Sequence, residues 1–180
     1  MKSFTVSVLL PCTPDVFWRV YLDPEYLRAL HVGELACKRF DVVETTPTSR
    51  KLRIVPKMSV PGPVEALIGE SFVYEDHGTL DRARNEWTWR MVQPKDLDPK
   101  AKPRNDVVTT RGVVRVEPVS EGTCRRTDEV TIEAKILGLG GVIESAVEKE
   151  LRAARAKEFA FLTRWIDPRD PCLSRLGRSS

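Results

Sequence analysis

The chain has 180 residues, a formal net charge of +3 and 41% hydrophobic residues. This length suits one domain with a core of its own, and the hydrophobic content excludes a chain that is disordered by composition. The apolar runs stay short of the ~20 residues that a membrane-spanning helix needs. Acids are interspersed among the basic residues, without the dense basic patch and stacking aromatics typical of nucleic-acid binders, so we expect no nucleic-acid partner.

The N-terminal segment lacks the features of a signal peptide, because its apolar run is short and soon meets Pro11. We therefore expect a cytoplasmic protein whose cysteines are single, reduced thiols, packed or idle. The sequence contains no C-x-x-C pair and no histidine at ligand spacing from a cysteine, and common catalytic and nucleotide-binding motifs are missing. We expect no metal, no cofactor and no catalytic residue. The cysteines are Cys12, Cys37, Cys124 and Cys172.

The first third of the chain predicts a strand and two short helices. Residues 3–10 alternate between apolar and polar side chains, which is typical of a half-buried strand. Thr13-Pro14-Asp15 then supplies an N-cap, a proline at the first helical position and an acid in the first turn. Asp23-Pro24-Glu25 repeats this arrangement and predicts a second helix, which ends at Leu30.

Strand patterns fill the middle of the chain, separated by turn residues. The predicted strands cover residues 35–46, 50–56, 71–78, 86–92, 107–117 and 124–136. Between them, residues 58–71 contain Pro61-Gly62-Pro63 and form either an ordinary connection or a lid over an opening. Residues 93–106 are rich in prolines and charges, which predicts a surface loop.

The last predicted strand alternates strictly, with one entirely polar face. Its other face is apolar except near the start, where Arg126 and Asp128 fall. Buried charges need partners. This pair therefore satisfies itself, lies at a wet end of the sheet, or anchors the polar group of a ligand.

A helical pattern over residues 141–166 ends the folded part and would be roughly 39 Å long at 1.5 Å per residue. Its apolar stripe needs an apolar surface of similar length, and the preceding strands supply one if their sheet curls around the helix. Glu158 lies beside the stripe, where it either faces Arg126 or lies on the surface. We predict an α+β fold in which a curved antiparallel sheet of six to seven strands grips this helix. Residues 168–180 are expected to be a disordered tail.

This order of elements resembles the START-like helix-grip superfamily, which includes the Bet v 1-type and polyketide cyclase-type domains. The resemblance is carried by PCTPDVFW at residues 11–18, by DPEYL at residues 23–27 and by the glycine-led terminal helix. It covers roughly residues 2–166 and is greatest with small, poorly characterised bacterial members. The resemblance implies one domain over residues 1–167, with a cavity between sheet and helix that holds lipids, sterols, polyketides or other apolar molecules.

We therefore hypothesise that the protein binds or transfers an apolar, lipid-like small molecule inside the cell. The expected cavity lining comprises Trp87, Trp89, Met91, Val114, Val130, Ile132, Val147, Leu151 and Leu162. Four side chains are candidates for a polar anchor, namely Arg126, Asp128, His31 and Glu158.

Two other functions stay open. A cyclase or dehydratase would need a polar pair inside the cavity, such as Arg126 with Asp128 or His31. A protein-interaction module of the cochaperone type would show an exposed apolar patch and no cavity. The basic run Arg50, Lys51, Arg53 and Lys57 has no acid within it, which indicates a solvated strand edge or a weak contact with phosphates or a membrane surface. The oligomeric state does not follow from the sequence.

Overall fold

The computed structural model describes residues 1–57, 73–94 and 108–166, which form one antiparallel sheet and a set of helices. The strands are β1 (Lys2–Leu10), β2 (Arg39–Thr45), β3 (Ser49–Val55), β4 (Tyr74–Asp81), β5 (Glu86–Val92), β6 (Val108–Ser120) and β7 (Thr123–Ala134). The helices are α1 (Pro14–Tyr21), α2 (Pro24–Arg28), the π-helical segment η1 (Ala29–Glu34) and α4 (Gly140–Ile166). The seven strands follow the order β1-β7-β6-β5-β4-β3-β2.

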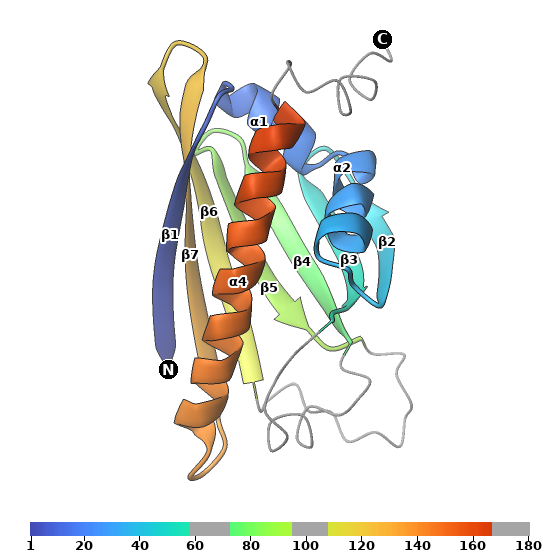
Figure 1. Ribbon diagram of the computed structural model, residues 1–180, viewed down its shortest axis with the longest axis vertical. Coiled ribbons are helices and arrows are strands. Elements are labelled where there is room, and N and C mark those ends of the chain that lie inside the picture. Colours follow the sequence, from blue (N-terminus) through green and yellow to red (C-terminus); the bar gives the residue numbers. More distant parts are fainter. Residues whose placement is uncertain (58–72, 95–107, 167–180) are drawn as a thin grey trace.

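The predicted fold is confirmed, because the sheet curves around a single long C-terminal helix. Figure 1 shows α4 running along the inner face of the sheet, with α2 and η1 beside β2 and β3. The predicted lid at residues 58–71, most of the predicted loop at residues 93–106 and the tail at residues 168–180 lie outside the described residues.

Three of the predicted boundaries are wrong. The second helix does not end at Leu30, because the N–H of Leu35 donates to the Leu30 carbonyl at 2.8 Å and the chain continues as η1. Residues 35–38 consequently do not join β2, which begins at Arg39. Strand β4 extends three residues beyond its predicted end at residue 78, because it pairs with β5 as far as Asp81.

The N-caps of the first helices are those that the sequence predicts. The Thr13 hydroxyl accepts a hydrogen bond from the Val16 N–H at 3.4 Å, and the Asp23 carboxylate accepts one from the Glu25 N–H at 2.7 Å. These caps start two helices across a gap of two residues, so the chain can cover one end of the sheet.

Two glycines on the inner face make room for two tryptophans of β5. A Cβ atom at Gly78 would overlap the indole of Trp87, which lies on the neighbouring strand. A Cβ atom at Gly112 would collide with the Trp89 ring and with the Glu129 carbonyl oxygen. Each indole therefore lies over a glycine of an adjacent strand, which lets the sheet carry large rings on its inner face.

Helix α4 is held from both sides. On one side Glu144 accepts a hydrogen bond from the Ala134 N–H at 3.0 Å, which joins the start of the helix to β7. On the other side the Tyr26 ring lies 5.9 Å from Phe161 and 5.6 Å from Trp165, and Arg164 forms a 2.9 Å ion pair with Glu34. The helix therefore spans the sheet between β1–β7 and α2–η1.

Candidate functional site

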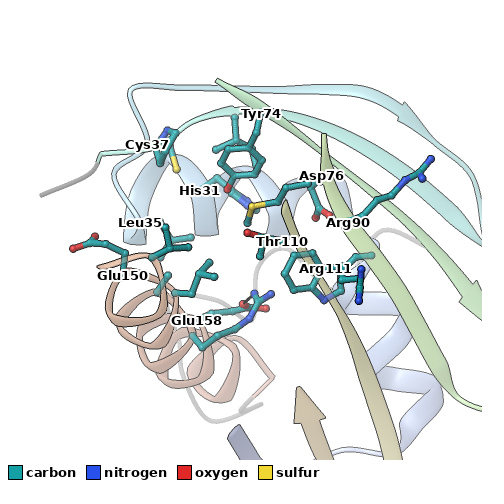
Figure 2. A pocket seen from close by; sticks show the side chains of 18 of the residues that line it. His31, Leu35, Cys37, Tyr74, Asp76, Arg90, Thr110, Arg111, Glu150 and Glu158 are labelled. Carbon is teal, nitrogen blue, oxygen red and sulfur yellow. Dashed lines mark hydrogen bonds and ion pairs between the residues drawn. The ribbon is translucent and has the colours of Figure 1, made fainter. Parts of the chain in front are cut away.

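A cavity of about 660 Å³ lies between α4, η1 and strands β3 to β6. Its wall is mainly apolar, with Leu30, Leu35 and Ile54 facing Val147 and Leu151 of the helix. Polar groups gather on the sheet side. In Figure 2 the side chains of His31, Tyr74, Asp76 and Thr110 point into the same space from η1, β4 and β6.

The apolar side chains of the inner face differ in burial from one end of the sheet to the other. Met91, Val147 and Leu151 face inward but are only partly buried, because the cavity lies next to them. By contrast, Trp87 and Leu162 are 0% exposed. The space between sheet and helix is therefore hollow at one end and packed at the other.

Of the nine expected lining residues, four line the cavity and five do not. The cavity is lined by Trp89, Met91, Val147 and Leu151. The others belong to the packed core and are at most 1% exposed, namely Trp87, Val114, Val130, Ile132 and Leu162. For the four strand residues the inward orientation follows from alternation and for Leu162 from the apolar stripe of α4, but neighbouring side chains cover all five.

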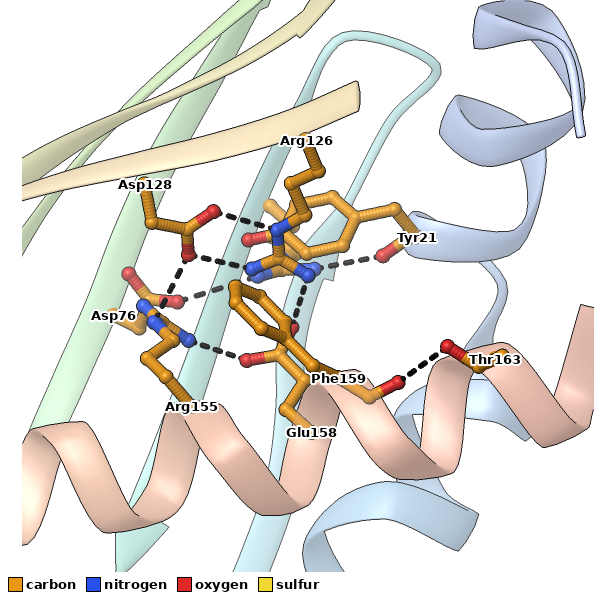
Figure 3. A network of polar contacts seen from close by, with 9 residues as sticks. Tyr21, Asp76, Arg126, Asp128, Arg155, Glu158, Phe159 and Thr163 are labelled. Carbon is orange, nitrogen blue, oxygen red and sulfur yellow. Dashed lines mark hydrogen bonds and ion pairs between the residues drawn. The ribbon is translucent and has the colours of Figure 1, made fainter. Parts of the chain in front are cut away.

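The candidate anchors Arg126 and Asp128 are satisfied by each other and by the helix. Arg126 donates two hydrogen bonds to Asp128, at 2.6 and 2.7 Å, and a third to Glu158 at 2.7 Å. Arg155 contacts the same two carboxylates and closes the network, with its Nε atom 3.0 Å from Asp128. Figure 3 shows these two cations and two anions between β7 and α4.

The position of this network indicates a structural role, which is to join β7 to α4. Arg126 and Asp128 are 0% exposed and do not line the cavity, whereas Arg155 and Glu158 do line it. Burial alone would raise the pKa of Glu158, but the charges and hydrogen bonds of Arg126 and Arg155 hold it well below its usual value. Arg155 was not among the predicted site residues. Its place in the network depends on where α4 meets β7.

His31 lines the cavity without contacting that network. Its Nδ1 atom lies 2.8 Å from the Leu27 carbonyl oxygen, and its ring stacks on Phe40 at 4.5 Å. A carbonyl can only accept, so Nδ1 carries the proton and Nε2 is an acceptor in the neutral ring. Burial lowers the pKa of His31, an effect that the hydrogen bond to Leu27 only partly opposes. A mainly neutral imidazole at neutral pH is the consequence.

A second ion pair, which sequence reasoning missed, lies on the sheet side of the cavity. The guanidinium of Arg50 donates to the Tyr21 carbonyl oxygen at 2.8 Å and to Asp76 at 3.5 Å, and it lies over the Tyr21 and Trp87 rings. Arg50 and Asp76 both line the cavity. Alternation along residues 50–56 signals this orientation, because Arg50 shares a face with the buried Leu52.

The basic run around Arg50 is divided between the two faces of the sheet. Arg50 is buried on the inner face. Lys51 and Arg53 point outward and pair with Glu44 at 3.6 Å and with Glu75 at 2.7 Å. The expectation of a strand edge is wrong, because β3 lies between β2 and β4 and the edge of the sheet is β2.

Cys12 and Cys124 are free thiols, as the sequence predicts, and they pack against each other. Their sulfur atoms are 3.8 Å apart in a buried contact between the end of β1 and the start of β7. Across the described ranges, no group of three or more potential metal ligands is placed to hold an ion. Within those same ranges, no helix is both long and apolar enough to cross a membrane.

A curved antiparallel sheet that grips a long C-terminal helix beside an apolar cavity defines the helix-grip class of proteins. Within that class, the chain belongs to the family described as "Protein of unknown function (DUF2505)", which it matches over residues 5–166. None of the curated proteins compared with the chain matches it.

Solved structures share this fold at low sequence identity. An aromatase/cyclase, Zhui, from a Streptomyces species has a TM-score of 0.67 and 12% identity, over 93% of this chain and 94% of that chain. Norcoclaurine synthase from Thalictrum flavum has a TM-score of 0.60 and 17% identity, over 89% of this chain and 85% of that one. The allergen Ara h 8.0201 has a TM-score of 0.53 and 10% identity, over 89% of this chain and 97% of that one.

Proposed function

We propose that this protein binds or transfers an apolar small molecule, which it holds in the cavity between the sheet and α4. The observation that supports the proposal is the cavity itself, at about 660 Å³. That volume falls within the roughly 300–1,000 Å³ of small-molecule sites, which are typically apolar with a few polar groups. The partly buried Met91, Val147 and Leu151 would complete their burial against such a molecule.

The names of the structural neighbours suggest classes of test ligand. Norcoclaurine synthase has been crystallised with dopamine and hydroxybenzaldehyde, and Zhui is an aromatase/cyclase. We therefore include small aromatic molecules beside fatty acids, fatty alcohols and sterols. Native mass spectrometry of protein purified from cells, followed by displacement of an environment-sensitive naphthalene dye, would reveal which class binds.

A cavity-filling variant tests whether the ligand binds in this cavity. Leu151→Trp places an indole into the cavity and should weaken dye and ligand binding by about tenfold or more, since overlap with a ligand costs several contacts. Val142→Trp is the matched control, because Val142 lies on the same helix and is 58% exposed. If no molecule is bound after purification and no ligand class displaces the dye, the proposal fails.

The two alternatives receive less support. An enzyme of the cyclase type was expected to use Arg126 with Asp128 or His31. Arg126 and Asp128 lie outside the cavity lining with their hydrogen bonds satisfied, and His31 lines the cavity but bonds to the Leu27 carbonyl rather than to that pair. A cochaperone-type module was expected to have no cavity. We therefore propose neither function.

A further inference from the structure

Asp76 accepts fewer hydrogen bonds than the two buried carboxylates near the cavity, Asp128 and Glu158. Asp128 and Glu158 each contact both Arg126 and Arg155. Asp76 contacts Arg50 through Oδ2 at 3.5 Å, the outer limit of a hydrogen bond, and within the described ranges its Oδ1 accepts none. Most of the hydrogen-bonding capacity of this carboxylate is therefore unused.

So few hydrogen bonds are unusual for a carboxylate in the position of Asp76. It lies on the inner face of β4, opposite the buried Leu52 of β3 and opposite Met91 of β5, and it lines the cavity. Its side chain is only 15% exposed. A carboxylate in an apolar wall is costly unless hydrogen-bond donors surround it. A ligand with a donor at this point would remove that cost.

At the end of the cavity that meets the buried ion pairs, the numbers of positive and negative charges are equal. The buried cations are Arg50, Arg126 and Arg155, and the anions are Asp76, Asp128 and Glu158. The other charged residues of the lining reach water, because Arg90 and Arg111 are exposed and Glu150 is partly exposed, so water screens them. A ligand that carries a net charge into this end would leave that charge uncompensated, which favours a neutral ligand.

Donors also lie close to the cavity. Trp89 Nε1 and Tyr26 Oη are buried and, within the described part of the chain, have no hydrogen-bond partner. Both residues line the cavity. Burial raises the pKa of Tyr26, so its hydroxyl stays protonated and can donate. A group that both donates to Asp76 and accepts from an N–H or O–H fits this set, and a hydroxyl does both.

We propose that the ligand carries a neutral hydroxyl group, of an alcohol or a phenol, which donates a hydrogen bond to Asp76 on the sheet side of the cavity. This inference rests on the proposed function and adds the chemical class of the ligand. A carboxylate can only accept and would lie against Asp76 with the same charge. An ammonium group can only donate and would bring a net charge into a neutral site.

Three probes of equal chain length test the proposal, namely 1-decanol, decanoate and decylammonium, each measured by dye displacement at neutral pH. We expect 1-decanol to bind about tenfold or more tightly than decanoate, because the carboxylate loses a hydrogen bond to a charged group and gains repulsion. Decylammonium should also bind more weakly than 1-decanol. Equal or tighter binding of decanoate would overturn the proposal and leave the proposed function standing.

The variant Asp76→Asn keeps the shape of the side chain and removes its charge. We expect the preference for 1-decanol over decanoate to fall to about threefold or less, mainly because decanoate binds better. Glu75→Gln is the matched control, because Glu75 is the adjacent carboxylate on the outer face and pairs with Arg53 and His77. Glu75→Gln should keep the wild-type preference for 1-decanol over decanoate.

Failure of the assignment to Asp76 and failure of the proposed function would give different results. An unchanged preference in Asp76→Asn would show that Asp76 does not select the ligand, and would overturn the assignment of the hydroxyl to this residue. Binding of none of the three probes, together with no molecule bound after purification, would overturn the proposed function and the inference with it.

Discussion

Gly78 shows how a single missing side chain shapes the inner face of the sheet. The Trp87 indole occupies the place that a Cβ atom at residue 78 would take, and Trp87 is 0% exposed. The ring also lies 5.8 Å from Tyr21, so a displaced indole would disturb α1 as well. Glycine is therefore required here for close packing rather than for backbone freedom.

Gly78→Ala should lower the free energy of unfolding by about 1–3 kcal/mol, the usual cost of overpacking a core. Urea unfolding followed by circular dichroism would measure it. Gly33→Ala is the control, because a Cβ atom there meets nothing within 4 Å among the described residues, and it should change stability by no more than about 0.5 kcal/mol. Equal effects of the two substitutions would contradict the packing argument.

His31 should make stability depend on pH. Burial lowers its pKa from the ordinary value of 6.5, so the unfolded chain binds a proton more readily than the folded protein. The stabilising contribution of the neutral ring is therefore complete above about pH 6.5 and is lost as the pH falls from there towards the lower folded pKa. His31→Gln should flatten the pH dependence of the unfolding free energy in this range.

His77 provides the comparison for this prediction, because the chain contains two histidines. His77 lies on the outer face and contacts Glu75 at 2.8 Å. His77→Gln should leave the contribution of His31 in place. An unchanged pH profile in His31→Gln would mean that the folded and unfolded states bind this proton equally well.

At the scale of elements, α4 and β7 are joined by buried charges as well as by apolar packing. Glu158→Gln would leave Arg126 and Arg155 with too little negative charge around them in a site that is largely shielded from water. Breaking a buried pair in this way costs about 3–5 kcal/mol. Denaturant unfolding should show this loss with an unchanged slope, since the same surface is exposed on unfolding.

The control for Glu158 lies on the same helix. Glu148 pairs with Arg152 at 2.9 Å near the surface, so Glu148→Gln should cost no more than about 1 kcal/mol. The contribution of Glu158 to the free energy of unfolding should decrease in acid. Because its folded pKa is lowered, its contribution is present above its ordinary value of 4.5 and decreases as the pH falls below that value.

The order of elements could be predicted from the sequence because each one has local signals. Proline, N-cap and alternation signals mark β1, α1, α2 and β7, and these depend on neighbours within a few residues. The π-helical η1 has no such signal. It forms because the chain after Leu30 packs against α4 and β2, a contact that residues 29–34 alone do not encode.

The candidate site was less predictable than the fold. Alternation placed Arg126 and Asp128 on the inner face, and they lie there. Their partner Arg155 and the cavity residue Asp76 depend on how α4 crosses the sheet, so their roles follow only from tertiary packing. Local patterns show which face a side chain occupies, but not which side chain lies opposite.

At the scale of the whole molecule, local sequence patterns also fail to show where the cavity lies. Leu162 and Leu151 lie on one apolar stripe of α4, yet Leu162 is buried in the packed core and Leu151 borders the hollow. The aromatic residues of α1 and α2 fill the space near Leu162, with Phe17 and Tyr26 both 0% exposed. In the described part of the chain, the rings that line the hollow, such as Tyr74 and Trp89, border the space beside Leu151 without filling it.

A ligand in that hollow should stabilise the whole fold, because the cavity exists only in the folded state. At a free ligand concentration of 100 Kd the gain is about 2.7 kcal/mol, which would raise the thermal midpoint of unfolding by several degrees. The shift should disappear in Leu151→Trp and persist in Val142→Trp, whose substitution lies on the exposed side of α4. An equal shift in both variants would place the bound molecule outside the cavity.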